Sequence, residues 1–321
     1  LIQSIIMTGA LIVITVFGIN QAGGIDVVAA NARALPGYLS FTQIHDVATG
    51  AAKPYSLLNI ASMFAWGLGY FGMPHILVRF MAIRDEKELD LSRRIAAVWV
   101  VISMTVAVCI GMIGYSVSKA GNIPVLEGSA SETVIVQISN LLSTFGLFPA
   151  IVAGCILAGI LAATMSTADS QLLAASSAFS ENLLGDVFGI KLDAKKNMLV
   201  ARLTVIVIAI IAVFLASDPN SSVFKIVSFA WAGFGATFGP AMLCALFWKR
   251  SNLPGIMAGL VTGGVMVFVW KFGIAKLGGM FAIYELMPAF LCALVAIVVV
   301  SLMTPAPTKE ITDIFDECNK K

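Results

Sequence analysis

Most of this chain consists of apolar runs that are long enough to cross a bilayer. These runs constrain its fold more than any other feature. A helix needs about 20 mainly apolar residues to cross a hydrocarbon core of about 30 Å. Apolar residues make up 59% of the sequence and charged residues only 12%, whereas soluble domains contain about 45–50% and about 25%. We therefore expect an all-α polytopic membrane protein with about eight transmembrane helices. These helices are expected near residues 2–19, 56–82, 95–118, 147–178, 199–217, 222–247, 255–275 and 283–303.

The segments between the apolar runs have patterns of their own. Residues 20–54 form a long polar connection, in which we expect a short surface helix. Residues 131–144 are amphipathic, which favours a helix lying along the outer membrane surface over a further span. Leu1 stands inside an apolar run without a preceding methionine, so we expect the intact protein to have further residues before it.

Lysine and arginine fall mainly on one side of these alternating spans. The larger group comprises Arg79, Arg84, Lys87, Arg93, Arg94, Lys191, Lys195, Lys196, Arg202, Lys249, Arg250, Lys309, Lys320 and Lys321. The smaller group comprises Arg33, Lys53, Lys119, Lys225, Lys271 and Lys276. Because cytoplasmic loops carry the excess of basic residues, we expect the larger group and the C-terminus on the cytoplasmic side of the cell membrane.

The run over residues 148–178 carries polar side chains at a depth where a membrane helix tolerates few. They are Thr164, Ser166, Thr167, Asp169 and Ser170. A carboxylate at the bilayer centre costs about 2.5–3.5 kcal/mol even on lenient scales, so it indicates a functional site. Helical spacing of i, i+3, i+4 and i+7 places on one face Ala163, Ser166, Thr167 and Ser170. Hydroxyl, carbonyl and carboxylate oxygens are hard ligands, so this stripe is expected to be one wall of a sodium site.

Two other interpretations of the stripe remain open. Serine and threonine in membrane helices often donate hydrogen bonds to carbonyls of their own helix, or join neighbouring helices. Asp169 lies toward the cytoplasmic end of its run, and the alternative there is a solvated residue of an inner vestibule.

The second run is expected to be interrupted. Three glycines within residues 67–72 precede Pro74, which lacks an amide hydrogen and breaks the helical ladder. Transporters bind substrates at such breaks, because half-helix ends offer partial charges and unpaired backbone groups. Trp66 and Tyr70 lie one turn apart beside the break and are candidates for the wall of a solute site. The alternative is a kink that packs against a neighbouring helix.

The sixth run contains the glycine-rich stretch AWAGFGATFGP at residues 230–240. Small residues favour close helix packing, and gating at Pro240 is the alternative. Glu285 stands near the start of the last run at the outer surface, and we assign it no role.

Four blocks of this sequence resemble one known family. They are WGLGYFGMPH (66–75) with VRF (78–80), AATMSTADSQL (162–172), AWAGFGATFGP (230–240) and FWKR (247–250). On these blocks the chain is identified as a member of the sodium:solute symporter family, and within it most resembles the bacterial carriers of proline.

The resemblance implies a leucine-transporter-like fold of two inverted five-helix repeats. On this basis residues 2–19 are the last helix of the first repeat, and residues 56–247 are the five helices of the second. Residues 255–303 then hold two accessory helices, and residues 304–321 form a cytoplasmic tail of this single membrane domain, 1–321. The first four helices of the first repeat are not in this sequence, so we do not expect residues 1–321 to transport alone.

The resemblance also implies the site residues. Sodium would be bound by the Ala163 carbonyl and the hydroxyls of Ser166 and Thr167, and an additional cation by Asp169 and Ser170. The substrate-side positions would be Trp66, Tyr70 and Pro74. Met73 departs from the glutamine of the best-known proline carrier, which bears on the identity of the solute.

The function implied is symport, in which sodium as coupling ion drives uptake of a small amino acid, L-proline, by alternating access. Other solutes remain alternatives, as does a transporter-like sensory domain of a membrane kinase. An enzyme would need paired catalytic groups, and the spans offer no such pair, so no catalytic residue is assigned. The partners expected are the solute and the bilayer, with no nucleic acid and no obligate protein partner.

Overall fold

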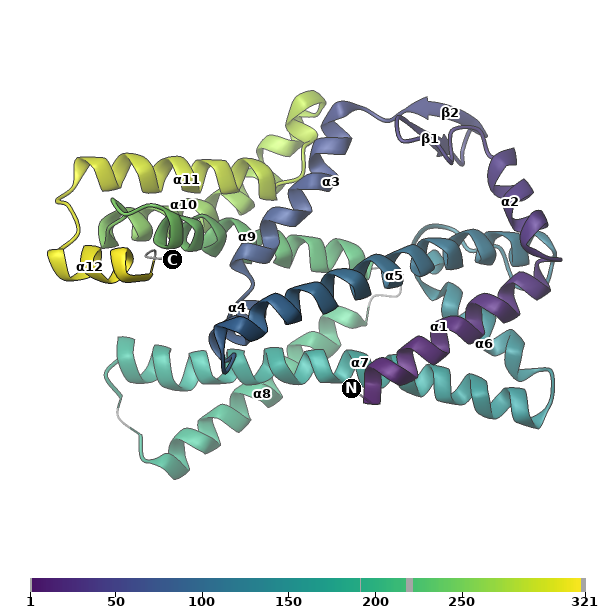
Figure 1. Cartoon of the computed structure of the whole chain (residues 1–321), viewed down its shortest axis with the longest axis horizontal. Coiled ribbons are helices and arrows are strands. Elements are labelled where there is room, and N and C mark those ends of the chain that lie inside the picture. The colour runs from purple at the N-terminus through teal and green to yellow at the C-terminus, as the bar shows by residue number, and fades with distance from the viewer. Residues whose placement is uncertain (1, 191, 218–221, 319–321) are drawn as a thin grey trace. The chain divides into compact units, whose positions relative to one another are not determined.

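The computed structural model describes residues 2–190, 192–217 and 222–318, and the chain is mainly helical over these ranges (Figure 1). The helices are α1 (Ile2–Gln21), α2 (Ile25–Ala34), α3 (Leu57–Gly69), α4 (Pro74–Met81), α5 (Glu86–Lys119), α6 (Val134–Ser143), α7 (Leu147–Ser177), α8 (Ala194–Ala216), α9 (Val223–Phe247), α10 (Leu253–Phe272), α11 (Leu286–Met303) and α12 (Lys309–Cys318). Shorter helical segments are η1 (Tyr70–Gly72), η2 (Gly128–Thr133), the π-helical η3 (Ala178–Val187), η4 (Ile274–Leu277) and η5 (Gly279–Ala282). Of the basic residues that indicate orientation, Lys191, Lys320 and Lys321 lie outside the described residues.

Within the described ranges, 6 helices are long and apolar enough to cross a membrane: α5, α7, α8, α9, α10 and α11. Helix α1 and helix α2, bent by 78° at the break between them, make a seventh candidate. The remaining expected span, 56–82, is broken into the shorter helices α3, η1 and α4. The chain is therefore a multi-pass, all-α membrane protein, as its apolar runs predict.

The chain forms two compact units. The first unit comprises Leu1–Pro54 and Ile83–Ser221, and the second comprises Tyr55–Ala82 and Ser222–Lys321. The predicted second repeat, residues 56–247, is divided between them. The assignment of inverted repeats and accessory helices stays a prediction.

The core of the first unit lies where α1, α5, α6 and α7 meet. Its buried side chains include Ile14 of α1, Ile113 of α5, Ile138 of α6 and Ile156 of α7. Gly18 allows α1 to approach α5 closely, because a Cβ atom there would lie 2.5 Å from Ile113 Cγ2. This core holds the N-terminal half of α7.

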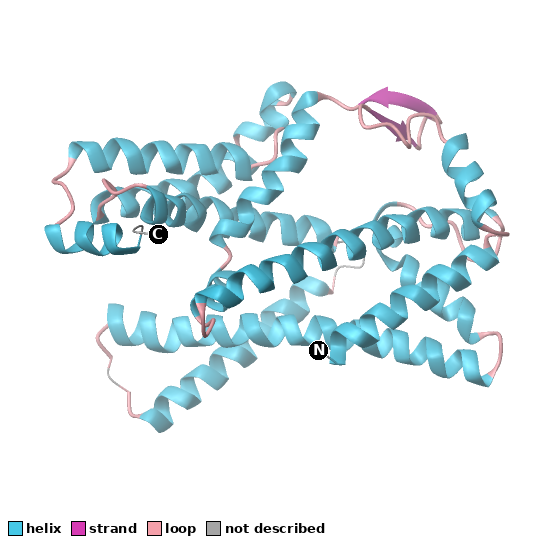
Figure 2. Ribbon diagram, viewed as in Figure 1, coloured by secondary structure: helices cyan, strands magenta, loops and turns pink. Residues whose placement is uncertain are grey.

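The polar connection 20–54 holds the expected short helix, α2, and also a β-hairpin that the sequence did not predict (Figure 2). Strand β1 (Gln43–Asp46) pairs antiparallel with β2 (Ala51–Pro54), with Asp46 opposite Ala51. Asp46 Oδ2 forms an ion pair of 2.5 Å with Lys53 Nζ. Hydrogen bonds from Lys53 and Thr49 hold the pKa of Asp46 down at about 2. The amphipathic segment at 131–144 forms η2 and α6, and α6 is too short to span a bilayer.

The core of the second unit is formed by α9, α10 and α11. Ala236 of α9, Val267 of α10 and Leu286 of α11 are fully buried there. Buried glycines recur every four residues along α10, at positions 255, 259 and 263. A Cβ at Gly263 would lie 2.2 Å from the Ala236 carbonyl oxygen. Small residues at this spacing let helix backbones approach closely, so the glycine-rich sequence of α10 determines the packing of this core.

Helix α9 continues without interruption through Pro240, which is buried. Gly235 of the same helix is in close contact with α3, since an added Cβ atom would lie 2.6 Å from Gly69 Cα. Gly239 is in close contact with α11, since a Cβ atom there would lie 2.6 Å from Phe290 Cε2. The glycine-rich stretch at residues 230–240 therefore acts in packing.

The segment after α11 is tied back onto the second unit. Asn252 Nδ2 donates hydrogen bonds of 2.7 Å to Thr304 Oγ1 and to the Pro305 carbonyl oxygen. Helix α12 follows, and an ion pair between Asp316 and Lys249 joins it to the turn after α9. The expected tail, 304–321, is thus helical over most of the part that the structure describes, and residues 319–321 lie outside that part.

Candidate functional site

The predicted cation residues all lie on α7, in the first unit. This helix is unbroken across them, so Ala163, Ser166, Thr167 and Ser170 keep the helical spacing that places them on one face. The buried residues Ala153 and Ile156 anchor the N-terminal half of α7 in the core. Within this unit Ser166, Thr167 and Asp169 are exposed.

Several hydroxyls of the stripe bond back to their own helix. Thr164 Oγ1 donates to the Ile160 carbonyl oxygen at 3.0 Å, and Ser170 Oγ donates to that of Ser166 at 2.7 Å. Thr167 Oγ1 donates a long bond of 3.4 Å to the Ala163 carbonyl oxygen. These bonds match the alternative interpretation of these residues, in which their hydroxyls donate to carbonyls of their own helix. They do not exclude a cation, because a hydroxyl that donates its proton keeps its oxygen lone pairs.

The donor set on this face fits sodium in its chemistry. The Ala163 carbonyl and the Ser166 and Thr167 hydroxyls are neutral oxygen donors, which suit hard cations. Ser166 Oγ makes no hydrogen bond within the described ranges, so its lone pairs are free. Asp169 forms no ion pair there either, and both of its interpretations, cation ligand and solvated carboxylate, stand.

The predicted solute residues lie together in the second unit, at an interruption between two helices. Helix α3 ends at Gly69, η1 spans Tyr70–Gly72, and Met73 is extended at φ −80°, ψ 113°. Pro74 then begins α4, where its missing amide hydrogen costs no helical hydrogen bond. The predicted break is therefore confirmed.

Two glycines bring this break close to α9. A Cβ at Gly72 would lie 2.4 Å from the Phe234 carbonyl oxygen, and one at Gly69 would lie 1.9 Å from Trp231 Nε1. The break thus serves packing as well, so the two interpretations of the sequence are compatible.

Aromatic rings surround Trp66 on α3. Its ring stacks with those of Phe224, Trp231 and Tyr284, at centroid distances of 5.4, 5.5 and 6.1 Å. Trp231 Nε1 also donates a 3.0 Å hydrogen bond to the Trp66 carbonyl oxygen. Tyr70 meets Trp231 edge to face at 4.8 Å and is 52% exposed. The rings of Trp66 and Tyr70 are therefore brought together by a third ring, Trp231.

Three members of this aromatic cluster were not among the predicted site residues. Phe224 and Trp231 come from α9, and Tyr284 precedes α11. Trp231 belongs to the glycine-rich stretch at residues 230–240, but the glycines of that stretch indicated close helix packing and gave no reason to place Trp231 at a binding site. The position of Tyr284 carries no sequence signal for this contact.

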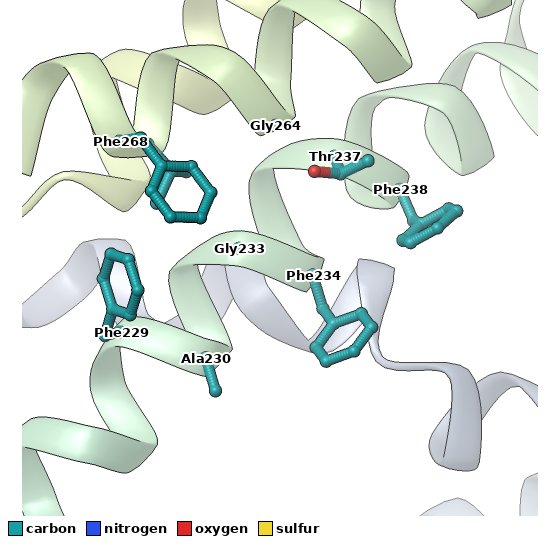
Figure 3. A pocket seen from close by; sticks show the side chains of 9 residues that line it. Phe229, Ala230, Gly233, Phe234, Thr237, Phe238, Gly264 and Phe268 are labelled. Carbon is teal, nitrogen blue, oxygen red and sulfur yellow. The ribbon is translucent and has the colours of Figure 1, made fainter. Parts of the chain in front are cut away.

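A separate cavity of about 270 Å³ lies against α9 and α10 (Figure 3). The rings of Phe229 and Phe268, which meet edge to face at 5.4 Å, line one part of it, and Thr237 supplies a hydroxyl among the otherwise apolar lining residues. None of the predicted solute residues lines this cavity. The apolar lining lacks the charged partners that an amino acid needs, so we do not assign the solute to it.

The structure does not group all predicted site residues in one place within a unit. The cation residues are on α7 of the first unit, and the solute residues are on α3, η1 and α4 of the second. The predicted cation residues therefore come from a single helix of the first unit, and the predicted solute residues from three consecutive helical segments of the second.

Comparisons with known proteins identify the family of the chain. The sequence model of the sodium:solute symporter family matches residues 1–263. The chain is 37% identical over 320 residues to the osmoregulated proline transporter OpuE of Bacillus subtilis, covering 99% of the chain and 61% of that protein. It is 37% identical over 316 residues to the high-affinity proline transporter PutP of the same organism, and this alignment covers 98% of the chain and 62% of that protein.

A third relative, the sodium/proline symporter of Haemophilus influenzae, is 41% identical over 266 residues, covering 82% of the chain and 51% of that protein. The chain thus spans about half to three fifths of the length of these curated relatives. Because the family model covers most of the chain and the four sequence blocks lie within its range, the chain belongs to the sodium:solute symporter family.

Proposed function

We propose that the intact protein is a sodium-coupled symporter that imports L-proline by alternating access. The observation that carries this proposal is the alignment of nearly the whole chain with relatives named as proline transporters and sodium/proline symporters. Transport is an activity of the whole protein, and the residues described here would supply part of both sites.

Sodium is a substrate of this reaction. The Ala163 carbonyl and the hydroxyls of Ser166 and Thr167 would bind it, because three neutral oxygens on one helix face match the preference of a hard cation. The remaining ligands would come from helices other than α7. Asp169 and Ser170, on the next turn, would form an additional cation site.

The solute would bind beside the break at Pro74. The parts of the Trp66 and Tyr70 rings that stay exposed within the unit offer apolar area for a pyrrolidine ring. Helix α4 begins at Pro74, and the positive end of its dipole favours a carboxylate. Together these features suit a small amino acid with an apolar ring and charged ends.

Sodium coupling supplies the driving force. A membrane potential of 100 mV contributes about 2.3 kcal/mol per charge moved, which supports roughly fifty-fold accumulation for one sodium ion. Sodium would favour the outward-open state by binding that state more tightly. The orientation we propose has the C-terminus in the cytoplasm, because this side receives the larger group of basic residues.

The test is uptake of radiolabelled L-proline into proteoliposomes that contain the intact protein. We expect accumulation with an inward sodium gradient, none with choline in place of sodium, and inhibition by excess unlabelled proline. Sodium-dependent currents without proline uptake would retain the ion site and reject proline as the solute. Absence of any response to sodium would contradict symport.

A further inference from the structure

Tyr284 joins the helices that carry the aromatic cluster of the second unit. Its backbone N–H donates a 3.1 Å hydrogen bond to Ser62 Oγ on α3, and its hydroxyl donates a 2.5 Å bond to the Ser228 carbonyl oxygen on α9. Its ring stacks on Trp66. Ser62 precedes Trp66 by one turn of α3, so both residues present the same face to Tyr284.

The contacts of Tyr284 are buried. Ser62 and Ser228 are 8% and 9% exposed. Ser228 lies on α9 between Phe224 and Trp231, which are the other two rings that stack on Trp66. Tyr284 therefore fixes the face of α3 that carries Trp66 against the face of α9 that carries its aromatic neighbours.

The next residue anchors Tyr284 to a further helix. Glu285 is 6% exposed, and its Oε1 atom lies 2.7 Å from Lys271 Nζ at the end of α10. The Lys271 ammonium also lies 5.5 Å from the centroid of the Phe229 ring on α9. A buried carboxylate is stable only with a paired charge, so this ion pair holds the start of α11, and Tyr284 with it, at one position on α10.

We propose that Tyr284, held by the Lys271–Glu285 ion pair, is a positioning residue for the solute site: it sets the orientation of Trp66. This inference rests on the proposed function, because it assigns Trp66 to the wall of that site. Tyr284 acts through Trp66 and needs no contact with the solute. Glu285, which the sequence left without a role, acquires one as the anchor of Tyr284.

The first experiment replaces Tyr284→Phe in the intact, reconstituted protein. This variant keeps the stacked ring and loses only the hydrogen bond to Ser228. We expect the KM for solute to rise about three- to tenfold, the effect of one lost hydrogen bond, with kcat and the half-saturating sodium concentration nearly unchanged. A residue of merely structural importance would lower the amount of folded protein and leave KM unaltered.

Trp270→Phe is the matched control. Trp270 Nε1 donates a 3.2 Å hydrogen bond to the Phe281 carbonyl oxygen, so it also joins α10 to the segment before α11, yet it does not touch Trp66. We expect an unaltered solute KM in this variant. Equal effects of Tyr284→Phe and Trp270→Phe, or no effect of Tyr284→Phe, would overturn the proposal.

The ion pair is tested by exchange of its charges. Glu285→Gln should raise the solute KM in the same direction as Tyr284→Phe, and the double variant Lys271→Glu/Glu285→Lys should restore it at least in part. A folded double variant with the KM of Glu285→Gln would overturn the role of the pair as anchor.

A second measurement separates this inference from the proposed function, because it needs no solute. Spin labels at Met63→Cys on α3 and Val227→Cys on α9, both exposed positions, report the distance between these helices when the native cysteines are replaced by alanine. Tyr284→Phe should broaden the distance distribution and Trp270→Phe should not. An unchanged distribution would overturn the inference even if proline is transported, whereas a broadened one in a protein that takes up no proline would reject only the solute assignment.

Discussion

Trp231 Nε1 donates a 3.0 Å hydrogen bond to the carbonyl oxygen of Trp66, and the two rings stack at 5.5 Å. A side chain of α9 thereby holds both the backbone and the ring of a residue on α3, one turn before that helix breaks. Gly69 makes this contact possible, since any side chain there would collide with the indole of Trp231. The aromatic wall of the proposed solute site is thus held by two helices at once.

Trp231→Phe should weaken this arrangement without removing the stacked ring. The lost hydrogen bond is expected to lower the free energy of unfolding by about 0.5–1.5 kcal/mol and to raise the solute KM. Thermal unfolding in detergent and uptake kinetics measure the two effects. A variant with the wild-type KM would show that the hydrogen bond does not orient Trp66.

Trp66→Leu should affect solute more than sodium. The substitution removes the ring on which three aromatic residues stack, while the oxygens of the proposed sodium site, on α7, are untouched. We expect the solute affinity to fall at least about tenfold, or 1.4 kcal/mol, and the half-saturating sodium concentration to change less. Binding isotherms for both substrates give the comparison, and a larger loss for sodium would contradict the placement of Trp66.

Ser166→Ala and Thr167→Ala should each raise the half-saturating sodium concentration, because each removes one oxygen donor from α7. The expected change is about tenfold, in the range for a hydrogen-bonding group that interacts with a charge. Sodium titrations of proline uptake provide the measurement. The folded protein should be recovered in normal amounts, since both side chains are exposed in their unit.

Two threonines provide matched controls for this pair. Thr164 and Thr204 bond back to the carbonyl oxygens of Ile160 and Val200, as Thr167 does to that of Ala163. Neither is assigned to the cation, so Thr164→Ala and Thr204→Ala should leave the sodium requirement unchanged. Sodium dependence that is equally unaltered in all four variants would reject the site on α7.

Asp169→Asn distinguishes the two interpretations of this carboxylate. If Asp169 binds an additional cation, as we propose, removal of its charge should raise the half-saturating sodium concentration. Asp186→Asn, at an exposed carboxylate of η3 in the same unit, is the control. Identical sodium titrations for both variants would identify Asp169 as a solvated vestibule residue.

Much of the fold was predictable because membrane helices are determined locally. Apolar run length predicts α5 and α7–α11, and proline chemistry predicts the break at Pro74. The β-hairpin and α12 were missed for a different reason: both lie in polar segments where no apolar run marks an element. The ion pairs Asp46–Lys53 and Asp316–Lys249 accompany these elements, and hydropathy does not encode such pairings.

The candidate site was predictable only along single helices. The spacing of Ala163, Ser166 and Thr167 follows from the helical period, so one sequence segment contains the whole face. The aromatic cluster could not be found in this way, because Ser62 and Tyr284 meet although 222 residues separate them. A contact between residues so far apart in the sequence depends on how α3, α9 and α11 pack together.

Gly72→Ala should destabilise the second unit through the break itself. A Cβ atom at this position would lie 2.4 Å from the Phe234 carbonyl oxygen and 2.9 Å from Gly235 Cα, so backbone on α9 would have to move. Overpacking of this kind costs about 1–3 kcal/mol.

Gly67→Ala is the matched control, because a Cβ at Gly67, on α3 just before the break, would meet nothing within 4 Å. We expect Gly72→Ala to lower the midpoint of thermal unfolding and Gly67→Ala to leave it unchanged or raise it, since alanine favours helix over glycine. Equal midpoints for the two variants would mean that α9 does not pack on the break as described.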